Sequence, residues 1–216
     1  MPEISRLNSR FKEKYPEFDH ILFGEIPYKK LFDLFQLLAT VKYATKDQLN
    51  SEFPKIATDR KPIRKLTKLT ELGYLDQTNG VYRATKKTYD LLKAENYNIA
   101  ILPKIPSEGG DAHSLKCTDE ILKARKEPFF YAIIYPYFKI FRPDFSIVYK
   151  DGDKAKWVMI EVERTEKPPR YLENKKLDYE LLGKNDLAYR SWKYWAEKLG
   201  LRACSESEFC FGWRVV

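Results

Sequence analysis

Features that restrict a protein to a membrane or to an oxidising compartment are missing from this sequence of 216 residues. No apolar run reaches the roughly 20 residues of a membrane-spanning helix, and the first ten residues lack the apolar centre of a secretion signal. The three cysteines have no metal-binding spacing, and their odd number leaves one thiol without a disulfide partner. We therefore expect a cytoplasmic protein with reduced thiols in its core and no membrane among its partners.

Internal repeats and low-complexity tracts are also lacking. Hydrophobic residues make up 44% of the chain and charged residues 32%, a composition typical of a folded soluble protein. The net charge is +8, and a basic balance favours a polyanionic partner. The length suits one large domain or two small ones.

Helical periodicity and turn signals organise the first half of the chain. Thr45 is expected to cap a second helix, and a third is expected to begin near Thr58 or Asp59, with Pro62 in its first turn. Asn79-Gly80 between two short alternating runs predicts a β-hairpin, and a further helix follows over residues 86–95. The first helix is predicted from apolar residues at helical spacing: Leu31, Leu34, Phe35 and Leu38.

Three helices followed by a hairpin are the order of elements in the winged helix-turn-helix family. The stretch from Lys68 to Leu75, with Val81-Tyr82-Arg83 after it, resembles the recognition helix and wing of that family. The resemblance implies that this helix enters the major groove of double-stranded DNA. A solvated basic face, or a winged helix that binds protein, is the alternative. The residues expected to contact DNA are Arg60, Lys61, Arg64, Lys65, Lys68 and Arg83.

Proline and glycine mark a boundary between two domains. We expect a DNA-binding domain with an N-terminal arm over residues 1–100, a linker over 101–111 and a second domain over 112–216. The second domain is expected to run helix, strands, helix, helix, strand, which is the order of an α/β or α+β fold. Its centre is a predicted hairpin, in which residues 141–149 and 156–163 form the strands.

Three carboxylates interrupt the apolar pattern of this hairpin: Asp144, Glu161 and Glu163. Buried acidic groups are costly unless they bind a metal or pair with cations. Glu161 and Glu163 are expected on one face of a strand, and Asp144 approaches them if the two strands are antiparallel neighbours. Converging carboxylate oxygens suit Mg²⁺ or Mn²⁺, so Asp144 and Glu161 are the predicted metal ligands.

Pro143-Asp144 followed by Glu161-Val162-Glu163 resembles the metal-binding motif of the restriction-endonuclease-like, or PD-(D/E)xK, superfamily. The resemblance implies a metal-dependent DNA nuclease fold, in which Asp144, Glu161, Glu163 and Lys175 would be catalytic. The usual motif ends in lysine where this chain has Glu163, and Lys175 or Lys176 on a following helix is the predicted substitute. The departure also fits a nuclease fold that has lost its activity.

A longer resemblance joins the winged helix, His113, Arg142-Pro143-Asp144, the strand ending Glu161-Val162-Glu163-Arg164 and a helix with Tyr179. In these features the chain resembles the replication-relaxation family of plasmid and mobile-element proteins. That resemblance implies a role in replication or transfer of mobile DNA, with a second copy of the chain or a replication or transfer protein as further partners.

Structural explanations for the same residues stay open. Glu161 and Glu163 on an exposed strand face can form ion pairs with Arg142, Lys156 or Arg164. His113 can be an ordinary helix histidine, and Tyr179 a core residue. Under this alternative the protein is a non-catalytic module that binds DNA or a partner protein.

Overall fold

The protein is described from a computed structural model. The described residues are 11–19, 28–54, 62–98, 102–104, 112–138, 142–163, 168–184, 187–202 and 204–216. The chain divides into two compact units. Met1–Tyr97 and Lys104–Gly110 belong to the first unit, and Asn98–Pro103 and Asp111–Val216 to the second.

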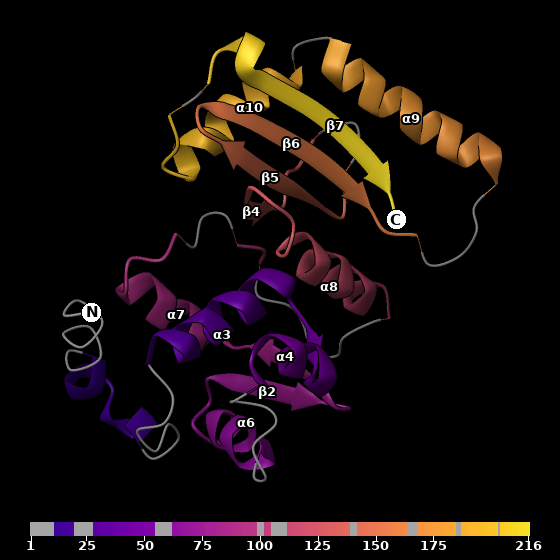
Figure 1. The fold of residues 1–216 in the computed structure, drawn as a ribbon. Helices are drawn as coiled ribbons and strands as arrows, with labels where there is room; N and C mark the ends of the chain where they lie inside the picture. The colour runs from indigo at the N-terminus through magenta and orange to yellow at the C-terminus, as the bar shows by residue number, and fades with distance from the viewer. Residues whose placement is uncertain are drawn as a thin grey trace. The chain divides into compact units, whose positions relative to one another are not determined.

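Helices form most of the first unit, and those that begin at Tyr28, Lys46, Pro62 and Lys86 were expected from their sequence patterns (Figure 1). The four apolar residues predicted to form one face of the first helix are each no more than 1% exposed. Thr45 caps the second helix in a capping box with Gln48, as its sequence predicts. The helices are α3 (Tyr28–Val41), α4 (Lys46–Glu52), α6 (Pro62–Glu71) and α7 (Lys86–Ala94), after a short 3₁₀ turn, Pro16–Phe18.

The first unit also contains a small antiparallel sheet. Strands β1 (Ala44–Thr45), β2 (Leu75–Thr78) and β3 (Val81–Ala84) lie in the order β1-β3-β2. Thr78 pairs with Val81, which leaves Asn79 and Gly80 as a two-residue turn with φ angles of 52° and 79°. Asparagine and glycine tolerate this left-handed backbone, so the hairpin forms where it was predicted.

Burial of one lysine in α6 contradicts the prediction that this lysine is exposed. Leu66 and Leu69 are fully buried and fix the inner face of this helix. Lys65 lies one turn before Leu69 and is itself only 6% exposed. The expectation that Lys65 stands on the exposed basic face is therefore wrong, because the phase of the helix places it beside the leucines.

A four-stranded mixed sheet is the centre of the second unit (Figure 1). The strands lie in the order β4-β5-β6-β7, with antiparallel neighbours except for β7, which runs parallel to β6. The fold is thus mixed helix and strand, as expected. In chain order the elements are α8 (Ala112–Ala124), β4 (Phe130–Ile134), β5 (Phe145–Asp151), β6 (Lys154–Glu161), α9 (Pro169–Lys184), α10 (Leu187–Lys198) and β7 (Phe209–Val215).

Helices α9 and α10 cover one face of this sheet. Trp157 and Met159 of β6 are completely buried in the same apolar cluster as Tyr179 of α9 and Trp192 of α10. The indole nitrogen of Trp157 donates a hydrogen bond to Ser146 Oγ at 2.8 Å, which satisfies two buried polar groups. Because strand side chains alternate, Glu161 points to the same face as Trp157 and Met159.

Candidate functional site

Asp144 lies immediately before β5, at the end of the hairpin where β6 finishes. Its amide nitrogen donates to Ile160 O at 3.1 Å, and its Oδ2 accepts a hydrogen bond from Val162 N at 2.8 Å. Phe145 pairs with Ile160, so Asp144 lies one step further along, level with Glu161. The backbone therefore holds the Asp144 carboxylate in one orientation beside the last residue of β6.

Glu161 is a buried carboxylate that two side chains of α9 contact. It is 5% exposed. Its Oε1 accepts a hydrogen bond from Tyr179 Oη at 2.6 Å and forms an ion pair with Lys175 Nζ at 2.7 Å. Lys175 and Tyr179 are four residues apart and so lie one above the other on one face of the helix. The ion pair compensates a charge that would be expensive to bury alone.

The pKa values of the two α9 side chains respond to both carboxylates. Burial alone would lower the pKa of Lys175. The hydrogen bond and charge interaction with Glu161, together with the charge of Asp144, outweigh that effect, so the pKa is raised. Burial raises the pKa of Tyr179, and the hydrogen bond to Glu161 and the charges of Glu161 and Asp144 add to the rise. Both carboxylates therefore favour the protonated forms of Lys175 and Tyr179.

Helix α8 adds a histidine and a cysteine to the site. His113 Nε2 lies 2.8 Å from Asp144 Oδ1, and Cys117 Sγ lies 3.6 Å from the same ring nitrogen. His113 and Cys117 are one helical turn apart. The expectation of core thiols is correct for Cys204, which is buried, and wrong for Cys210, which is exposed; Cys117 is half-buried.

Not every predicted residue of the carboxylate site joins this group. Glu163 lies two residues beyond the end of β6; its amide donates to Val216 O at 2.9 Å and its carbonyl accepts from Lys116 Nζ at 2.8 Å. Lys176 is mostly exposed and lies 3.9 Å from Glu180 Oε1. Of the two candidate lysines, Lys175 is the one that contacts Glu161.

The residues expected to contact DNA differ in their exposure and in their partners. Lys68 of α6 is half-exposed and pairs with Glu71 at 2.8 Å. Arg83 of β3 donates its Nε to Asp76 Oδ2, the residue opposite it in the hairpin, at 2.8 Å. Lys65 is buried, as described above. Arg60 and Lys61 lie outside the described residues, as does the side chain of Arg64.

Two residues of the site were not assigned to it from the sequence. Tyr179 was open to interpretation as core, and it is both core and the hydrogen-bond donor to Glu161. Cys117 was grouped with the other thiols. Its signal was the spacing His113-x-x-x-Cys117, which places imidazole and thiol on one helical face.

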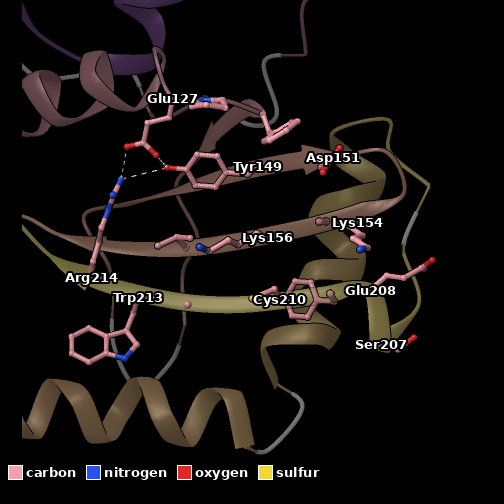
Figure 2. A pocket seen from close by; sticks show the side chains of 16 residues that line it. Glu127, Tyr149, Asp151, Lys154, Lys156, Ser207, Glu208, Cys210, Trp213 and Arg214 are labelled. Atoms are coloured by element: carbon pink, nitrogen blue, oxygen red, sulfur yellow. Dashed lines mark hydrogen bonds and ion pairs between the residues drawn. The ribbon is translucent and has the colours of Figure 1, made fainter.

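A separate cavity of about 730 Å³ lies over the face of the sheet that carries Tyr149, Lys156 and Arg214 (Figure 2). Glu127, Tyr149 and Arg214 meet at one end of it. Tyr149 donates a hydrogen bond to Glu127, and Arg214 Nη2 lies 3.3 Å from Glu127 Oε1. Asp144, Glu161 and Lys175 do not line this cavity, so it is distinct from the carboxylate site.

No protein-family model matches the chain, and neither curated proteins nor solved structures gave a match. Among the helices of the described ranges, none is long and apolar enough to cross a bilayer.

Proposed function

We propose that the protein binds double-stranded DNA and hydrolyses its phosphodiester bonds at the site formed by Asp144, Glu161 and Lys175. The observation that carries the proposal is the contact of Lys175 with Glu161 beside Asp144, at one end of the β5–β6 hairpin. The order of helix, three antiparallel strands, helices and a parallel strand resembles the restriction-endonuclease-like fold. In this interpretation Lys175 on α9 replaces the lysine that usually ends the motif.

The donor set fits a hard divalent cation. Asp144 and Glu161 offer carboxylate oxygens, the ligands that Mg²⁺ and Mn²⁺ prefer, and the register of β5 and β6 puts the two residues level with each other. When bound, such an ion activates water and stabilises charge on an attacked phosphate. Hydrogen bonds from Val162 N to Asp144 and from Tyr179 to Glu161 hold the two carboxylates in place.

Lys175 suits a role in stabilising charge. Its raised pKa keeps the ammonium protonated at neutral pH, so it does not serve as a base that takes a proton from water. In the hydrolysis, water adds to phosphorus and gives up a proton to solvent, one P–O bond of the backbone breaks, and the departing oxygen takes a proton from solvent. Lys175 places a positive charge where negative charge develops on the phosphate.

The first unit supplies the proposed DNA contact. Helices α3, α4 and α6 followed by the β2–β3 hairpin support a winged helix-turn-helix arrangement, with α6 as the recognition helix. Lys68 is the described basic residue of α6 that remains half-exposed, and the net charge of +8 favours a polyanion. From the resemblance to replication-relaxation proteins, we propose that this activity serves the replication or transfer of mobile DNA.

Cleavage of supercoiled plasmid with Mg²⁺ or Mn²⁺ tests the proposal. The wild type is expected to nick or linearise the plasmid, and Glu161→Gln to lose this activity. Glu173→Gln, which makes the same exchange at an exposed carboxylate of helix α9, is the control and is expected to cleave normally. If the wild type binds the plasmid and cleaves it with neither metal, the enzyme proposal fails.

One observation favours a second candidate, a DNA-binding module without catalysis. Lys175 and Tyr179 already compensate the charge of Glu161, so the buried carboxylate is stable as a structural ion pair. This candidate predicts that calorimetry detects no binding of Mg²⁺ or Mn²⁺, and that Glu161→Gln leaves DNA binding unchanged. The cleavage and calorimetry results together separate the two functions.

A further inference from the structure

One ring nitrogen in the second unit faces two potential metal ligands at once. His113 Nε2 lies 2.8 Å from Asp144 Oδ1 and 3.6 Å from Cys117 Sγ. The ligand atoms of these three side chains all lie within 4.8 Å of one another. All three side chains are half-buried, so they are accessible to an ion and partly shielded from water.

The spacing of these atoms suits tetrahedral coordination. Zinc binds histidine nitrogen at about 2.0–2.1 Å and cysteine sulfur at about 2.3 Å, so the two ligands of one ion lie about 3.5 Å apart. The nitrogen and sulfur here are 3.6 Å apart. The nitrogen and the carboxylate oxygen would separate from 2.8 Å to about 3.3 Å as the ion replaces the hydrogen bond between them.

The surrounding backbone already orients the ligands. His113 and Cys117 are held one turn apart on α8 (Ala112–Ala124). The Oδ2 of Asp144 is fixed by Val162 N at 2.8 Å, which leaves Oδ1 directed at His113. Hydrogen bonds of this kind to a ligating carboxylate are the usual support of a metal site.

We propose that His113, Cys117 and Asp144 form a binding site for one divalent transition-metal ion of the zinc class. Imidazole and thiolate ligands select zinc, cobalt or a similar ion, whereas Mg²⁺ takes oxygen ligands. Binding releases the proton of the Cys117 thiol, because the thiolate is the ligand. Three protein ligands leave a fourth position for water or a further group.

This site goes beyond the proposed hydrolysis and does not depend on it. The two sites have Asp144 in common, but the zinc-class site draws its other ligands from α8 and the hydrolytic site draws Glu161 and Lys175 from β6 and α9. Metal binding can be measured without DNA. Metal-binding measurements can therefore confirm this site even if the protein cleaves no DNA, and they can refute it even if the protein does cleave DNA.

The test is a titration of the full chain with Co²⁺, followed in the absorption of the thiolate-to-cobalt charge transfer. We expect saturation at one equivalent and displacement by Zn²⁺. Cys117→Ser is expected to abolish the band, and His113→Asn to weaken cobalt affinity by about tenfold or more. Cys210→Ser, at an exposed cysteine, is the matched control and should keep the band. Glu161→Gln should also keep it while losing any DNA cleavage.

X-ray absorption at the zinc edge of the wild-type protein gives a result that needs no variant. One sulfur ligand for each zinc is expected, with nitrogen or oxygen in the other positions. The proposal is overturned if the wild type shows no thiolate band and no sulfur ligand, or if a folded Cys117→Ser variant keeps the band.

Discussion

At the scale of single residues, the stability of the site depends on the side chains that compensate the buried charge of Glu161. Lys175 and Tyr179 both approach its Oε1, at 2.7 Å and 2.6 Å. Removing one partner of a buried pair costs more than the pair itself contributes, because the remaining group is left uncompensated. Tyr179 is therefore a residue of the site as well as of the core, where it stacks on Trp213.

Tyr179→Phe tests the hydrogen bond to Glu161 without changing the ring. The side chain is 1% exposed, and loss of a bond to a charged acceptor is expected to lower the free energy of unfolding by about 2 kcal/mol. Urea denaturation measures the change. Tyr194→Phe, at an exposed tyrosine of α10, is the control and should change stability little. Equal stabilities of the two variants would contradict the assigned role of Tyr179.

Glu127 gives a prediction about acid sensitivity (Figure 2). Its hydrogen bond from Tyr149 lowers its pKa, outweighs the opposing effect of burial and is reinforced by Arg214. The folded state therefore favours the ionised carboxylate. This stabilisation is present above the unfolded pKa of about 4.3 and disappears as the pH falls through the lower folded pKa.

We expect Glu127→Gln to be less stable than the wild type at pH 7, and the difference to shrink as the pH is lowered below about 4. Urea midpoints measured across the acid range give the comparison. Tyr149→Phe removes the largest cause of the shift and should weaken the acid dependence in the same range. A difference that stays constant down to pH 3 would show that Glu127 is not coupled to folding in this way.

The sequence predicted the pairing of Asp144 and Glu161 because strand alternation and an antiparallel hairpin place them at the same end. It named Lys175 as the catalytic lysine, but it gave no physical reason to exclude Lys176. That choice depends on which face of α9 meets the sheet, and the face is set by packing of Tyr179 against Trp213 rather than by local periodicity. The contacts of His113 and Cys117 likewise require α8 to be placed beside a hairpin about 30 residues away in the chain, which spacing alone does not give.

At the scale of elements, turn and capping signals were the most informative. The Asn79-Gly80 turn and the Thr45 capping box form as predicted, because each depends on neighbouring residues only. Helix α10, expected only from the order of elements, begins at Leu187 and ends at Lys198. Ala188 and the partly buried Tyr189 give the inner face of its first turn, next to Trp192.

Helix α6 carries a prediction about DNA. Lys68→Ala is expected to weaken binding to duplex DNA and to reduce the slope of log affinity against log salt by about 0.9, the value for one lost phosphate contact. Fluorescence anisotropy at several salt concentrations measures both quantities. Lys93→Ala, at an exposed lysine of α7, is the control. An unchanged affinity and slope for Lys68→Ala would reject α6 as the DNA-contacting helix.

At the scale of the whole molecule, the two proposed activities, DNA binding and hydrolysis, are assigned to two units that differ in their helices and strands. The first unit contains helices α3, α4, α6 and α7 and the short strands β1, β2 and β3, and basic residues of α6 and β3 are assigned to DNA contact. The second has the mixed sheet with Asp144 and Glu161 at one end of its central hairpin. Binding and hydrolysis are thus assigned to separate units, so a variant of the carboxylate site should lose cleavage and retain DNA binding.

The most direct test of this account compares the plasmid cleavage rates of Lys175→Ala and Lys176→Ala with Mg²⁺. The two lysines are neighbours on α9, but only Lys175 contacts Glu161, whereas Lys176 is an exposed partner of Glu180. Lys175→Ala is predicted to slow cleavage by about 100-fold or more, and Lys176→Ala to cleave at nearly the wild-type rate. Equal rates for the two variants, or no cleavage by a wild-type protein that binds the plasmid, would contradict the account.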